Sequence, residues 1–168
     1  MKNIGIICEY NPFHRGHALQ FDIIKKGFGD DCRIIALMSG NVVQRGETAV
    51  FCKYQRARAA VTSGADLVLE LPYPYSGSCA EIFARGGVLA FSALGNIDCI
   101  AFGSENGELS ELELIAKRLS EPMLDKKIAE ITLKNPALSY PKARSEAYFS
   151  LYDRRLPISR TTRWELSI

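Results

Sequence analysis

The stretch that decides the fold is GIICEYNPFHRGHALQ, residues 5–20. A short run of mostly apolar, β-branched residues ends at Cys8 and gives way to a polar turn. The only two histidines of the chain, His14 and His17, follow within four positions and are separated by an Arg-Gly pair. Apolar residues at helical spacing then continue to Lys26. Strand, loop and helix in this order predict the first unit of a parallel sheet, with both histidines at the junction.

Three further apolar runs, at residues 33–38, 67–71 and 98–102, resemble the first one. Each is nearly continuous rather than alternating, which is typical of strands buried on both faces of a parallel sheet. Segments of helical character, residues 54–62 and 79–94, lie between them and end at Ser-Gly and Gly-Asn pairs. The alternation predicts an α/β fold with a Rossmann-like parallel sheet and right-handed crossovers.

The second half of the chain has a helical pattern. We expect one helix over residues 108–119, a second from a Ser120–Pro122 cap to about residue 133, and a third over about 139–151. We therefore divide the chain into an α/β core, residues 1–107, and a helical extension of the same domain, residues 108–157.

Composition excludes several classes of protein. With 168 residues, 47% hydrophobic and 24% charged, the chain suits one globular domain, and a net charge of +2 gives no sign by itself of a nucleic-acid binder. No apolar run is long enough to span a bilayer, so we expect a cytoplasmic protein without a membrane partner. The five scattered cysteines contain no Cys-x-x-Cys pair, which argues against a disulfide framework or a zinc site.

The histidine-containing turn suits phosphate chemistry. Ligands of parallel sheets bind beyond the carboxyl ends of the strands, and the N-terminus of a helix offers free N–H groups and partial positive charge. Imidazoles at that place can donate to phosphate oxygens and stabilise the charge that develops on a transferred phosphoryl group. The alternative is that His14 and His17 are ordinary turn and cap residues. A zinc pair is disfavoured because no third ligand is evident, so we predict no metal ligands.

Five motifs, taken in order, resemble the bacterial tRNA(Met) cytidine acetate ligase family within the HIGH nucleotidyltransferase superfamily. They are GIICEYNPFHRGH (5–17), MSGNVVQRGE (38–47), GADLVLELPYPYS (64–76), AEIFARGGV (80–88) and FGSENG (102–107). The resemblance covers about residues 1–150. It implies an enzyme that uses ATP, with Mg²⁺, to convert acetate to acetyl-adenylate. The acetyl group would then pass to N4 of the wobble cytidine of elongator tRNA(Met). The oligomeric state is not implied.

The resemblance also implies site residues. His14 and His17 would be catalytic, holding the phosphates and stabilising the adenylation transition state without a covalent enzyme intermediate. The implied ATP-binding segment consists of Ile7, Cys8, Glu9, Tyr10, Asn11, Pro12, Phe13, His14, Arg15, Gly16, His17, Ala18, Leu19 and Gln20. From the second motif, Ser39 and Asn41 would hydrogen-bond a ligand, and Arg45 would pair with phosphate or acetate. Gly103 and Ser104 would bind the adenosine.

Some readings stay open at this point. Lys53, Arg56 and Arg58 cluster at the start of a helix, against the dipole preference, which favours either anion binding or a solvated face. Glu70 interrupts an apolar run and is expected either to face the site or to pair with a base such as Arg58. Alternative functions are a small-molecule nucleotidyltransferase and a truncated, inactive nucleotide-binding remnant.

The tail, residues 158–168, departs from the family pattern. The family normally shows Asn-Asn-x-Leu-Gly-Ile-Glu-Tyr after the YPKARS segment (140–145), whereas this chain ends in WELSI. One set of codons for WELSI reads Leu-Gly-Ile-Glu-Tyr when the frame moves by one base. We interpret the tail as frameshifted or truncated, which would remove an asparagine expected at the ATP site and leave ligase activity in doubt.

We predict that the coding DNA for residues 158–168 contains the family stretch in a frame shifted by one base. Sequencing the coding DNA checks this directly. A related chain that carries the same tail in frame would contradict it.

Overall fold

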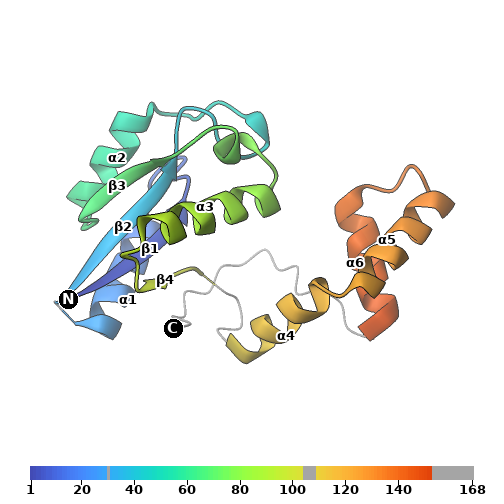
Figure 1. Ribbon diagram of the computed structural model, residues 1–168. Coiled ribbons are helices and arrows are strands. Elements are labelled where there is room, and N and C mark those ends of the chain that lie inside the picture. The colour runs from blue at the N-terminus through green and yellow to red at the C-terminus, as the bar shows by residue number, and fades with distance from the viewer. Residues whose placement is uncertain (30, 104–108, 153–168) are drawn as a thin grey trace. The chain divides into compact units, whose positions relative to one another are not determined.

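The computed structural model describes residues 1–29, 31–103 and 109–152 (Figure 1). The chain divides into two compact units, with the boundary after residue 107. The first unit holds all the strands of the described residues, and the second is helical. The domain boundaries expected from the sequence, including a helical extension to residue 157 and a separate tail, stay predictions, and the tail lies outside the described residues.

A four-stranded parallel sheet forms the centre of the first unit. Its strands are β1 (Lys2–Cys8), β2 (Cys32–Ser39), β3 (Leu67–Leu71) and β4 (Cys99–Ile100), in the order β3-β2-β1-β4. This arrangement confirms the predicted α/β, Rossmann-like class followed by helices. The strands β2 and β3 lie on one side of β1, and β4 lies on the other side. The strand order therefore reverses at β1.

Successive side chains along each strand point to opposite faces of the sheet, and both faces are apolar. One face, including Ile4, Ile6 and Ile34, packs against α1 (Arg15–Phe28) and α2 (Lys53–Thr62). The other face, including Ile35, Leu37 and Leu71, packs against α3 (Ala80–Leu94). Burial on both faces explains the continuous apolar runs of β1 and β2.

The burial of strand β3 differs from the expectation of a strand buried on both faces. It lies at the edge of the sheet, and Leu67 and Glu70 are exposed. Glu70 is therefore not a buried acid, and its carboxylate pairs with the ammonium group of Lys53 at 2.6 Å rather than with Arg58. Water access at the edge of the sheet removes the cost that a buried carboxylate would carry.

Helix α3 makes two close contacts through neighbouring glycines, Gly87 with the sheet and Gly86 with Tyr75. A Cβ atom on Gly87 would lie 2.5 Å from the side chain of Ile7, and one on Gly86 would collide with the ring of Tyr75. Glycine at position 87 is therefore a packing requirement, since a side chain there would push α3 away from β1, and a side chain at Gly86 would push α3 away from Tyr75.

The second unit consists of α4 (Leu109–Leu119), α5 (Pro122–Lys134) and α6 (Tyr140–Tyr152). Leu124 and Ile128 of α5 form a small core with Ala143, Ala147 and Tyr148 of α6. The N-cap of α5 is Glu121, so the expected Ser120 cap is wrong: the Ser120 hydroxyl donates instead to the carbonyl of Ala116. None of the described helices is both long and apolar enough to cross a membrane.

One buried arginine holds the loops at the carboxyl ends of the strands together. Arg56 of α2 is only 2% exposed, and its guanidinium donates to the carbonyls of Phe51, Glu9 and Gly40. These carbonyls belong to three separate segments: the loop before α2, the turn after β1 and the end of β2. One interpretation of the sequence placed Arg56 in an anion-binding cluster. Its burial rules out an exposed cluster of this kind.

We predict that Arg56→Met lowers the free energy of unfolding by about 2–4 kcal/mol, because it leaves buried carbonyls without donors. Urea denaturation followed by circular dichroism measures the change. Arg58→Met, at an exposed position on the same helix, is the matched control and is expected to stay within about 0.5 kcal/mol of the parent. Equal effects of the two substitutions would contradict the role of Arg56.

Candidate active site

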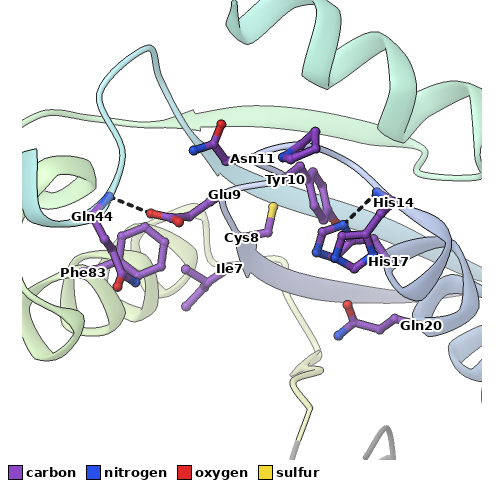
Figure 2. A pocket seen from close by; sticks show the side chains of 11 residues that line it. Ile7, Cys8, Glu9, Tyr10, Asn11, His14, His17, Gln20, Gln44 and Phe83 are labelled. Carbon is purple, nitrogen blue, oxygen red and sulfur yellow. Dashed lines mark hydrogen bonds between the residues drawn. The ribbon is translucent and has the colours of Figure 1, made fainter. Parts of the chain in front are cut away.

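A pocket of about 390 Å³ opens at the carboxyl end of β1, where the strand order reverses (Figure 2). This is the place where open parallel sheets bind ligands. Segments following β1, β2 and β3 all reach it. Its walls are formed by Ile7, Cys8, Glu9, Tyr10, Asn11, Pro12, His14, His17, Gln20, Gln44 and Phe83.

The two histidines close the first turn of α1 through a reciprocal capping box. His14 is the N-cap, and its Nδ1 accepts the backbone N–H of Gly16 at 3.1 Å. The Nδ1 of His17 accepts the backbone N–H of His14 at 3.2 Å. The cap reading from the sequence is therefore right as far as it goes, because both rings satisfy donors that the helix end leaves free.

Capping also decides what the rings offer to the pocket. Since Nδ1 of each neutral ring accepts a hydrogen bond, the ring proton resides on Nε2. The two rings are stacked, with centroids 3.7 Å apart and an angle of 21° between their planes. Tyr10 and Phe13 contact the His17 ring from its other sides. The pocket therefore receives two fixed N–H donors beside the N-terminus of a helix.

Burial keeps the His17 imidazole and the Cys8 thiol in this part of the pocket neutral. Burial lowers the pKa of His17 to about 4, and the neighbouring His14 adds to this effect. Burial likewise raises the pKa of the Cys8 thiol to about 12, and its Sγ lies 3.7 Å from the carbonyl oxygen of Leu37. At neutral pH, His17 is thus a hydrogen-bond donor without charge, and Cys8 is not a thiolate nucleophile.

Polar and aromatic groups of a different kind line the other side of the pocket. In Figure 2, Glu9, Gln44 and Phe83 lie on the side away from the histidines. The Oε1 atom of Glu9 accepts the backbone N–H of Gln44 at 2.6 Å. Gln44 begins the one-turn 3₁₀ helix η1 (Gln44–Gly46), and Phe83 belongs to α3. The pocket therefore presents imidazole N–H donors on one side and a carboxylate on the other.

The predicted ligand segment is only partly exposed to this pocket. Nine of its residues line the cavity, whereas five do not: Phe13, Arg15, Gly16, Ala18 and Leu19. Of these, Gly16 takes part through its N–H to the His14 ring, and Phe13 supports His17. Arg15 and Leu19 are exposed on α1.

The remaining predicted residues lie around the pocket rather than in its wall. Ser39 is fully buried at the end of β2, and the Oδ1 atom of Asn41 accepts the first backbone N–H of α2, from Lys53, at 2.9 Å. Arg45 is exposed in η1, where its backbone N–H donates to Ser78. Gly103 is half-buried after β4, and Ser104 lies outside the described residues. Their ligand roles stay predictions.

Gln44 and Phe83 were not among the predicted site residues. Both occur in motifs that the sequence singled out, MSGNVVQRGE and AEIFARGGV. Phe83 lies in the segment that the sequence predicts to be helical, and its side chain is only 6% exposed. Only the packing of α3 against β1 brings its ring to the pocket.

No group of three or more His, Cys, Asp or Glu side chains suited to a metal ion occurs within residues 1–29, 31–103 and 109–152. The donors that the pocket offers, two imidazole N–H groups and a helix N-terminus, suit phosphate oxygens. Fold and pocket together are typical of proteins that bind nucleotides at the first β-α junction.

Comparisons with known proteins identify the class. The sequence matches the HIGH Nucleotidyl Transferase family over residues 1–163, so the chain belongs to this family. The fold matches a crystal structure of Thermotoga maritima TmcAL bound with alpha-thio ATP, with a TM-score of 0.80 and 38% identity. That match covers 92% of this chain and 38% of the Thermotoga chain.

More particularly, the chain is homologous to the N-terminal part of tRNA(Met) cytidine acetate ligases. It is 45% identical to the ligase of Acetivibrio thermocellus and 47% identical to that of Clostridium acetobutylicum, over 148 residues in each case. These matches cover 88% of this chain but only 35% and 36% of the two ligases. The chain thus spans about a third of the length of these curated relatives.

We predict that His17 makes the protein less stable in mild acid. The unfolded imidazole titrates near 6.5 and the folded one near 4, so between these values the unfolded state binds more protons. The free energy of unfolding therefore falls as the pH drops from about 6.5 to about 4. Urea denaturation at several pH values is expected to show a smaller acid loss in His17→Gln than in the parent. Identical pH profiles of the two proteins would contradict the prediction.

Proposed function

We propose that this chain is the nucleotide-activating part of a tRNA(Met) cytidine acetate ligase. It would bind ATP, convert acetate to acetyl-adenylate, and pass the acetyl group to N4 of the wobble cytidine of elongator tRNA(Met). One observation carries the proposal: two stacked imidazoles present N–H donors to a pocket at the carboxyl end of β1 and beside the N-terminus of α1.

The histidines act by electrostatic stabilisation. Each Nε2–H donates to phosphate oxygens, and the N-terminal end of the α1 dipole adds partial positive charge. Such donors stabilise the charge that grows on the phosphoryl group as the acetate oxygen attacks it and pyrophosphate leaves. A covalent enzyme intermediate is not required, and the protonated thiol of Cys8 does not offer one.

ATP as the nucleotide is supported by the related Thermotoga structure with alpha-thio ATP. Mg²⁺ would accompany ATP and be held mainly by the phosphates, as is usual for this ion. Acetate and tRNA(Met) as partners are supported by the names of the relatives. A reaction on tRNA also favours a cytoplasmic location. Because the chain spans only about a third of these ligases, acetyl transfer to tRNA is the part of the proposal that depends most on the rest of such a protein.

Two other functions make different predictions about the same assay, acetate-dependent exchange of pyrophosphate into ATP. A small-molecule nucleotidyltransferase would catalyse exchange with another acid or with a phosphorylated substrate in place of acetate. An inactive remnant would bind ATP without exchange. The 38–47% identity to ligases of one kind favours the acetate reaction.

We predict that His14→Ala and His17→Ala each slow this exchange by about 30- to 1000-fold, corresponding to a loss of about 2–4 kcal/mol of transition-state stabilisation. His14→Asn separates capping from catalysis, since asparagine caps a helix well but lacks the Nε2–H donor. It is expected to keep the stability of the parent and to lose exchange. Exchange within threefold of the parent in His14→Asn would contradict the assignment.

A further inference from the structure

We propose that Glu9, Gln44 and Phe83 form a subsite that recognises the target cytosine and that Glu9 accepts its amine. The inference rests on the proposed function and deepens it. The family resemblance places Glu9 within an ATP-binding segment, whereas the charge distribution of the pocket assigns it to the second substrate.

Glu9 is held at two points, its side-chain carboxylate and its backbone carbonyl. Its Oε1 accepts the backbone N–H of Gln44, and the backbone carbonyl of Glu9 is held by the buried guanidinium of Arg56. Within the part of the chain that the structure describes, no donor contacts Oε2. A half-buried carboxylate that is fixed through one oxygen and lines a pocket offers its other oxygen to a ligand.

Electrostatics decides which ligand this oxygen suits. Phosphate and acetate are anions, and a carboxylate at close range repels them. A neutral group with N–H or O–H donors is attracted instead. In the proposed reaction these donors are the exocyclic amine of cytosine and, on ATP, the adenine amine and the ribose hydroxyls.

The position of the subsite favours cytosine over ATP. Glu9, Gln44 and Phe83 come from the segments that follow β1, β2 and β3, whereas β4 lies on the opposite side of β1. The crevice at the reversal of strand order, between β1 and β4, is the expected place for the nucleotide. The β2 side of the pocket is thus left for the second substrate.

The three side chains also complement the edge and face of the base. Glu9 accepts from the N4 amine, the pairing that carboxylates commonly make with cytosine. The side-chain amide of Gln44 can donate to N3 or O2, and the ring of Phe83 provides an apolar wall. Uracil would place its O4 acceptor against the carboxylate, so the subsite disfavours it.

The same contact gives Glu9 a role in the transfer step. The N4 nitrogen attacks the acetyl carbonyl carbon of acetyl-adenylate, forming a C–N bond. The bond between that carbon and the phosphate oxygen breaks, and AMP leaves with the electron pair. The proton lost from N4 passes to the carboxylate of Glu9, which acts as a general base.

Titration with free nucleosides tests the subsite. Cytidine, uridine and adenosine are added separately to the whole chain, and binding is followed by chemical-shift changes in NMR spectra. The parent protein is expected to bind cytidine about tenfold more tightly than uridine, in line with one well-placed base contact. Glu9→Gln is expected to reduce this preference to threefold or less. Glu47→Gln, which removes an exposed carboxylate from the same loop as Gln44, is the matched control and is expected to keep it.

Circular dichroism first establishes that the Glu9 variant folds. Phe83→Leu provides a second test, because it is expected to weaken the binding of cytidine and of uridine equally. Absence of cytidine binding, equal binding of cytidine and uridine, or a preference that survives in Glu9→Gln overturns the inference. So does a tenfold loss of adenosine binding in that variant with the cytidine preference intact, since Glu9 would then serve ATP. Pyrophosphate exchange in the parent protein, run without nucleosides, tests the proposed function separately.

Discussion

A single buried cation organises the loops at the carboxyl ends of the strands, next to the pocket. The guanidinium of Arg56 contacts carbonyls from the turn after β1, the end of β2 and the loop before α2. A planar group with five donors can satisfy three carbonyls at once, which lysine cannot do with comparable geometry. The loops at the carboxyl ends of β1 and β2 are therefore held in one arrangement. That arrangement determines the shape of the pocket.

The histidine pair caps a helix and lines the pocket at the same time. Each ring uses Nδ1 to complete the first turn of α1, and this use leaves Nε2–H directed to other partners. Burial, with a further contribution from the neighbouring His14, lowers the pKa of His17 and keeps it uncharged at neutral pH. The capping role and the proposed ligand-binding role of these residues are therefore compatible. One ring nitrogen, Nδ1, serves the cap, and the other, Nε2, remains for a ligand.

The pocket is also divided electrostatically. Imidazole donors and the N-terminus of α1 suit anions on one side, while Glu9 suits neutral donors on the other. In the proposed reaction, the first side would hold the activated acid and the second side would hold the amine. The narrow approach of α3 to β1, which requires Gly87, brings Phe83 to the second side and completes it.

The sequence by itself determined the elements and the centre of the site. The strand β3 and the ends of α2 and α3 agree with the expected bounds to within one residue, because continuous apolar runs and Ser-Gly or Gly-Asn stops are local signals. The histidine motif located the pocket for the same reason. Only the tertiary structure decided that Arg56 is a buried clamp, that Glu70 lies at an exposed edge beside Lys53, and that Gln44 and Phe83 reach the pocket. These properties depend on the order of strands in the sheet and on contacts between segments far apart in the chain, which no local pattern of residues records.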